Sequence, residues 1–142
     1  MTQMKLLEDA IEIAVQAHRG QTDKAGAPYV LHPLRMMNKV DAVEEKIVAV
    51  LHDVVEDTDW TFERLRERAF PEEILAALDC VTRREDETYE AFVERTKTNP
   101  VARRVKLADL EDNMDVRRLG PLTPKDADRL AKYQRAWRRL TE

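Results

Sequence analysis

The sequence predicts an all-α domain, a helical bundle of about seven or eight helices. Only three of its 142 residues are glycine, and nearly every segment places apolar residues at helical spacing. No segment alternates apolar and polar residues as a half-buried strand does. A length of 142 residues matches one domain, so residues 1–142 are expected to fold as a single unit.

The first part of the chain is expected to hold three helices. The first runs from about Met4 to His18, with an inward stripe of Leu7, Ile11, Ala14, Val15 and His18. A loop over residues 19–28 follows, because two glycines and a proline interrupt the pattern. The second helix is expected to start near Tyr29. The third starts near Asp41, where Asp41-Ala-Val-Glu44 resembles a capping box.

Helix-start signals recur through the rest of the chain. They are threonine N-caps at Thr61, Thr88 and Thr123 and early prolines at Pro71, Pro100 and Pro124. The last helix is basic but carries one apolar stripe, made of Leu130, Tyr133, Trp137 and Leu140. We expect this stripe to pack on the core. Binding of its basic face to a membrane or to nucleic acid is the alternative.

Composition argues against several classes of function. A net charge of −4 gives no general attraction to nucleic acid or to an anionic membrane. No window approaches 18 apolar residues, and no secretory signal follows Met1, so neither a transmembrane helix nor export is expected. The single cysteine, Cys80, excludes an internal disulfide and fits a reducing compartment. We therefore expect a cytoplasmic protein.

The most informative segment is Lys46-Ile-Val-Ala-Val-Leu-His-Asp-Val-Val-Glu-Asp57. Its apolar run predicts a buried helix that reaches His52 and Asp53, with Glu56 and Asp57 one turn later. Buried charges must be paired or must bind a metal, and acids near a helix C-terminus oppose the helix dipole. A divalent cation would resolve both problems, so this segment predicts a metal site.

His32 and Asp109 complete the candidate ligand set. Asp109 and Asn113 lie four residues apart, on the inward stripe of an otherwise apolar helix. Taken singly, each of these groups is more often a hydrogen-bonded core residue than a ligand, but the joint pattern favours a metal. Two imidazoles and two carboxylates suit manganese, iron or zinc. Glu56 and Asp57 are then placed to handle the proton of an attacking water.

Four motifs stand in order between about residues 4 and 120: His18-Arg-Gly-Gln21, Gly26-Ala-Pro-Tyr-Val-Leu-His-Pro33, Leu51-His-Asp-Val-Val-Glu-Asp-Thr58, and Val105-Lys-Leu-Ala-Asp109 with Asn113. They resemble the hydrolase domain of the RelA/SpoT family and, more closely, the stand-alone small alarmone hydrolases of the HD superfamily. The resemblance implies an HD fold and manganese-dependent removal of pyrophosphate from the 3′ position of guanosine tetra- or pentaphosphate. It also implies roles for single residues: metal ligands His32, His52, Asp53 and Asp109, catalytic acids Glu56 and Asp57, and nucleotide-pocket residues Lys24 and Asn113.

Two segments depart from the family pattern. Where the family usually has Arg-Lys, this chain has Asp23-Lys24, and an acid cannot stack on a base as a cation does. Asp23 is instead expected to accept a hydrogen bond from an exocyclic amine of guanine or adenine. The segment Leu110-Glu-Asp-Asn-Met-Asp115 is acidic where the family is basic. Both changes bear on the choice of nucleotide, and neither changes the metal ligands.

The expected partner is a small-molecule nucleotide, without nucleic acid or membrane, and the sequence leaves the oligomeric state open. Arg83 and Lys106 are candidates for binding the phosphates, with plain surface exposure as the alternative. An HD phosphohydrolase acting on an adenosine alarmone or another nucleotide is the second hypothesis. A nucleotide-sensing module without catalysis is the third, and the complete set of ligands and acids argues against it.

Overall fold

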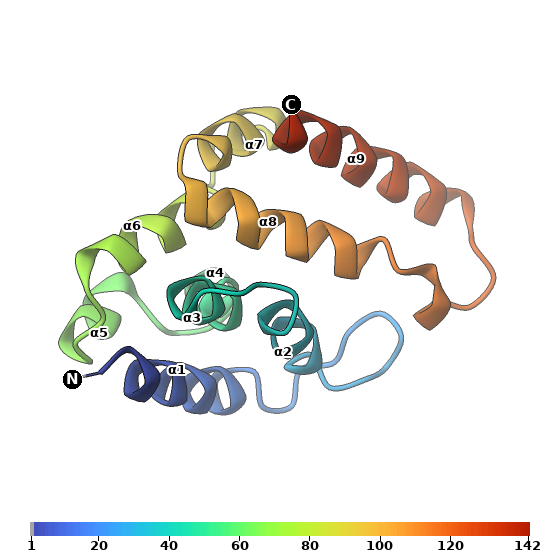
Figure 1. The fold of residues 1–142 in the computed structure, drawn as a ribbon. Coiled ribbons are helices and arrows are strands. Elements are labelled where there is room, and N and C mark those ends of the chain that lie inside the picture. The colour runs from blue at the N-terminus through green and yellow to red at the C-terminus, as the bar shows by residue number, and fades with distance from the viewer. Residues whose placement is uncertain (1) are drawn as a thin grey trace.

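The structure is a computed structural model that describes residues 2–142. Its elements are α1 (Gln3–Ala17), α2 (Leu31–Met37), α3 (Val43–Leu51), α4 (Val54–Asp57), α5 (Phe62–Glu67), α6 (Glu72–Val81), α7 (Tyr89–Lys97), α8 (Pro100–Asn113), the 3-10 helix η1 (Val116–Arg118) and α9 (Pro124–Thr141). Within the described range, strand-like pairing is confined to an isolated bridge between Thr22 and Pro28. The prediction of an all-α bundle is confirmed (Figure 1).

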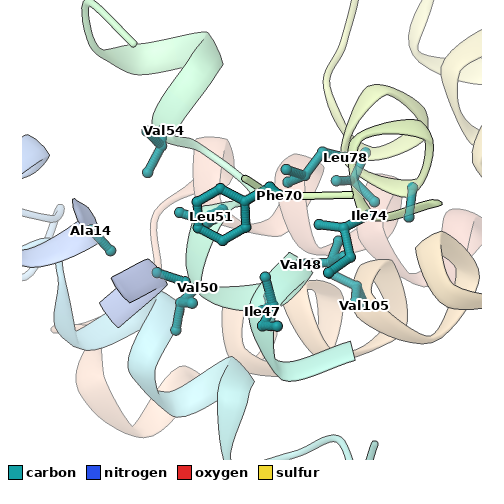
Figure 2. Packing of buried hydrophobic residues seen from close by; sticks show 14 of the residues in the cluster. Ala14, Ile47, Val48, Val50, Leu51, Val54, Phe70, Ile74, Leu78 and Val105 are labelled. Atoms are coloured by element: carbon teal, nitrogen blue, oxygen red, sulfur yellow. The ribbon is translucent and has the colours of Figure 1, made fainter. Parts of the chain in front are cut away.

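Helix α3 lies in the middle of the bundle and contacts α1, α2, α6 and α8 (Figure 1). It is buried on nearly every side, as its apolar run predicts. Figure 2 shows its residues among those of neighbouring helices: Ile47, Val48, Val50 and Leu51 of α3 with Ala14 of α1, Ile74 and Leu78 of α6 and Val105 of α8. Burying each large side chain contributes about 1.5–3 kcal/mol. This packing holds the C-terminal end of α3 in a fixed place.

The chain turns where α3 meets α4. Helix α3 ends at Leu51, and α4 begins at Val54. Between them Asp53 has φ −106° and ψ 0°, outside the helical region. The prediction of one continuous helix through Asp57 is therefore wrong. Because of the turn, the acids of α4 gather with Asp53, whereas His52 faces side chains of other helices.

Helix α1 and its C-cap confirm part of the predicted stripe: Ala14 and His18 are buried, and Leu7 and Ile11 are partly buried against the core. Its buried residues are Leu6, Ala10, Ile13 and Ala14. The prediction is wrong at Val15, which is 39% exposed. Two neighbouring stripes of α1 are apolar, and contact with α3 selects the one that is buried.

The predicted helix starts are confirmed at the three threonines whose side chains cap the following helix. Thr61, Thr88 and Thr123 each accept a hydrogen bond from the backbone N–H three residues later, at 3.1–3.2 Å. The start of α3 differs by one residue from the prediction. Its N-cap is Ala42, whose backbone N–H donates to Glu45 Oε1 at 3.1 Å.

Helix α9 runs antiparallel to α8 and packs against it (Figure 1). As predicted, most of its apolar stripe packs inward: Tyr133, Trp137 and Leu140 belong to a second hydrophobic cluster with α7 and α8, whereas Leu130 lies outside this cluster. Among residues 2–142, no helix combines the length and the apolar character that crossing a bilayer requires.

Candidate metal centre and the cleft around it

Three helices bring four ligand-type side chains together. His32 belongs to α2, His52 and Asp53 follow α3, and Asp109 belongs to α8. His32 Nε2 lies 2.9 Å from Asp109 Oδ1, and His52 Nε2 lies 3.6 Å from the same oxygen. His52 Nε2 also lies 2.9 Å from Asp53 Oδ2. The structure therefore gathers His32, His52 and Asp109 into one group, and Asp53, which adjoins it at His52, also belongs to a second group with Glu56 and Asp57.

The imidazole of His52 is oriented for a cation. Its Nδ1 lies 2.8 Å from the carbonyl oxygen of Ala49, an acceptor only, so Nδ1 must carry the hydrogen. In the neutral imidazole this leaves a lone pair on Nε2, which is buried and faces the carboxylates of Asp53 and Asp109, at the position where a cation could replace a proton. Burial lowers the pKa of His52, but these carboxylates outweigh it and raise the pKa well above its usual value. Two nitrogen and two oxygen donors around such an atom fit a divalent first-row metal.

The carboxylate of Asp109 is held in its charged form. Burial raises its pKa, but the Lys106 ammonium, at 2.7 Å from Oδ2, and the nearby imidazoles outweigh it and hold the pKa well below its usual value. Asn113 donates to Asp109 Oδ1 at 3.0 Å from one turn further along α8. An ionised carboxylate with a fixed orientation is the form that coordinates a cation.

Glu56 and Asp57 form an acidic group with Asp53 on the neighbouring α4. Burial and the charge of Asp53 raise the pKa values of both Glu56 and Asp57. The backbone N–H of Arg83 donates to Glu56 Oε1 at 3.0 Å, which fixes the carboxylate in place. Carboxyl groups with raised pKa values exchange protons more readily near neutral pH than ordinary acids do.

The cluster opens into a cleft of about 530 Å³, a volume that suits a small molecule. Beside the acids, four cationic side chains line it: Lys24, Lys106, Arg118 and Arg129. Two aromatic rings also line it, Tyr29 and Tyr133. Cations beside a metal-type cluster, with rings in the same wall, suit a ligand that carries both phosphates and a planar base.

Comparison with known proteins gives relatives over most of the chain, although no protein-family model matches it. It is 33% identical over 120 residues to a protein of Aquifex aeolicus named guanosine-3′,5′-bis(diphosphate) 3′-pyrophosphohydrolase, covering 76% of this chain and 17% of the relative. It is 32% identical over 146 residues to the bifunctional (p)ppGpp synthase/hydrolase SpoT of Escherichia coli, covering 92% of this chain and 20% of the relative. The chain is an HD domain of the RelA/SpoT type. It spans about a fifth of the length of these relatives.

The fold of this HD domain also matches a solved structure. The matching chain is described as a metazoan ortholog of SpoT that hydrolyses ppGpp. The TM-score is 0.76 with 22% sequence identity, over 95% of this chain and 84% of the other. At this identity the match shows a common fold, and it agrees with the predicted HD-type bundle.

The HD domain places four of the five predicted substrate-binding residues in the cleft wall: Asp23, Lys24, Lys106 and Asn113. Asp23 Oδ1 accepts hydrogen bonds from the backbone N–H groups of Ala25 and Ala27, both at 2.9 Å, so Asp23 also shapes its own loop. Arg83 is placed differently. Its guanidinium Nε donates to the carbonyl oxygen of Glu87 at 3.2 Å, and it is not among the residues that line the cleft.

Three residues of the HD domain reach the site without having been assigned a role from the sequence. Tyr29 donates its hydroxyl to the Asp53 carboxylate, and burial together with that charge raises the Tyr29 pKa. Arg118 lines the cleft, and its Nη1 lies 3.6 Å from Asp23 Oδ2. Asp112 lies behind His32. Tyr29 sits inside a quoted motif, but Asp112 and Arg118 carry no local signal, because their partners are distant in the sequence.

Proposed function

We propose that this HD domain is a metal-dependent hydrolase of the cytoplasm that removes the 3′-pyrophosphate from guanosine tetra- and pentaphosphate alarmones, with Mn²⁺ as its cofactor. The observation that carries the proposal is a cleft where the group of His32, His52 and Asp109 adjoins a second group, in which Asp53 lies beside two acids with raised pKa values. The names of the Aquifex and Escherichia relatives support the choice of substrate.

His32, His52, Asp53 and Asp109 would hold the cation. When bound, a divalent metal supplies Lewis-acid chemistry, drawing electron density from a phosphoryl oxygen and making water a better nucleophile. Lys106 neutralises the second oxygen of Asp109, which keeps that carboxylate ionised.

Glu56 and Asp57 would handle the proton. In the proposed reaction the oxygen of water bonds to phosphorus and the bond between phosphorus and the 3′ oxygen breaks, so one proton leaves the water and one reaches the 3′ oxygen. Glu56 is the candidate base for the water, because the Arg83 N–H favours its ionised form and leaves its second oxygen free to accept a proton. Asp57, with a raised pKa and beside the same Asp53, is placed to return a proton to the leaving oxygen.

The other walls of the cleft would bind the nucleotide. Lys24 is exposed at the cleft and has no ion-pair partner among the described residues, so its charge is available to a phosphate. Arg118 and Arg129 add two further guanidinium groups to the same wall. Tyr133 offers a partly buried ring on α9 for stacking.

The test is release of pyrophosphate from the guanosine and adenosine 3′-pyrophosphate alarmones, side by side, with Mn²⁺ and with chelator. Release from the guanosine compound that requires Mn²⁺ would support the proposal. Release only from the adenosine compound would change the base and keep the reaction. Tight binding of either compound without release would point to the sensing module instead.

A further inference from the structure

A buried carboxylate stands behind the His32 imidazole, on the side away from the metal cluster. Asp112 lies on α8, three residues after Asp109, and is 2% exposed. Its Oδ2 lies 2.6 Å from His32 Nδ1, while His32 Nε2 faces Asp109 at 2.9 Å. The ring of His32 is thus held between two carboxylates, one on each nitrogen.

Two arginines hold the Asp112 carboxylate in its charged form. Arg35 binds it through two parallel hydrogen bonds, Nε to Oδ1 at 2.7 Å and Nη2 to Oδ2 at 2.9 Å. Arg118 Nη2 donates to the Asp112 carbonyl oxygen at 2.8 Å and lies 3.3 Å from Oδ2. His32 and Arg35 are one turn apart on α2, so a single carboxylate on α8 fixes both side chains.

This arrangement settles which nitrogen of His32 carries the hydrogen when a cation is bound. A carboxylate only accepts, so Nδ1 must donate to Asp112. Nε2 is then left with a lone pair that points into the cluster. An imidazole without the carboxylate can take either tautomer and can rotate, and both changes remove the lone pair from the metal position.

We infer that Asp112 is a positioning residue for the metal centre: by fixing the tautomer and the orientation of His32, it sets the affinity for the divalent cation. The inference rests on the metal centre of the proposed function and not on the nucleotide. It uses a residue of this chain that stands in the segment where the sequence departs from the family pattern.

The experiment compares Mn²⁺ binding by the wild type, Asp112→Asn and Glu111→Gln, measured from the electron paramagnetic resonance signal of free Mn²⁺ during titration. Asn keeps the size and one acceptor oxygen but loses the charge, so affinity should fall by about 10- to 100-fold. Glu111 is the matched control, because it is exposed, adjacent in sequence and bound only to Lys39 at 3.3 Å. Equal affinity of Asp112→Asn and the wild type would overturn the inference.

A second measurement keeps the test decisive if Asp112→Asn fails to fold. The chain has three histidines, so the ring nitrogens of the zinc-loaded wild type can be resolved by long-range ¹H–¹⁵N NMR. Both His32 and His52 should carry hydrogen on Nδ1. A metal-loaded His32 protonated on Nε2 would overturn the inference.

The two proposals can fail separately. Mn²⁺ binding that depends on Asp112 in a protein that leaves every alarmone intact would refute the proposed function alone. Mn²⁺-dependent hydrolysis with unchanged affinity in Asp112→Asn would refute this inference alone.

Discussion

Replacing Glu56 by Gln separates the proton-handling role of Glu56 from its place in the structure. The amide oxygen of Gln can still accept the Arg83 N–H now bound at 3.0 Å, so the loop after α6 should keep its position. The amide cannot accept a proton from water. Loss of a general base lowers turnover by about 10²- to 10⁴-fold, which corresponds to about 2.7–5.5 kcal/mol of activation free energy.

The role of Glu56 as a base also predicts how kcat/KM depends on pH. Burial and the charge of Asp53 raise the pKa of Glu56 above its ordinary value of 4.5. A base is active when deprotonated, so wild-type kcat/KM should fall as the pH drops through a value above 4.5. Glu56→Gln should lose this limb.

The assay is alarmone hydrolysis at saturating Mn²⁺, with metal content measured for each variant. Glu85→Gln, an exposed substitution of the same chemistry on the loop after α6, is the control and should keep wild-type rates. Wild-type turnover in Glu56→Gln with full metal content would refute the assignment of Glu56 as the base.

Three further predictions concern metal and stability. Asp53→Ala should abolish Mn²⁺ binding, so that its melting temperature no longer responds to Mn²⁺ or chelator as that of the wild type does; a wild-type response would refute the ligand assignment. Ala69 has φ 70°, a conformation that glycine adopts more easily than alanine, so Ala69→Gly should raise the unfolding free energy by about 1 kcal/mol. Ala76→Gly, in the middle of α6, should lower it by about 1 kcal/mol. Denaturant melts in which both substitutions change the unfolding free energy in the same direction would contradict this. Arg95 lowers the Glu87 pKa from 4.5 to about 2, so Glu87→Gln should lower the unfolding free energy by about 1–2 kcal/mol at neutral pH. The difference in unfolding free energy between wild type and variant should disappear as the pH falls from about 4.5 to 2, because Glu87 then becomes protonated.

The features that the sequence predicts correctly depend mainly on interactions between residues that are close together in the chain. A threonine at Thr61 or Thr88 caps its helix through a backbone N–H three positions away, so the signal and the structure coincide. The cluster of His32, His52 and Asp109 was also visible, because polar groups in apolar helical settings are rare enough to stand out.

The features that escaped prediction depend on distant partners. The turn at Asp53 breaks a run that is helical by every local criterion. Asp112 carries no local signal beyond its place in an acidic segment, because its partner His32 lies 80 positions earlier. The stripe of α1 was misplaced at Val15 for the same reason: only contact with α3 distinguishes the two apolar faces.

The order in which the ligands occur along the chain bears on how the protein is made. His32 and Asp109 are separated by 77 positions, so a growing chain that ends before α8 lacks one carboxylate of the cluster. Such a chain can gather its imidazoles but cannot enclose the cation, and metal capture should follow the docking of α8. A cation held by the proposed ligands would close a long loop, which penalises the open chain more than a short loop would. The proposed centre could therefore acquire its metal only after α8 has been synthesised and has packed against α2 and α3.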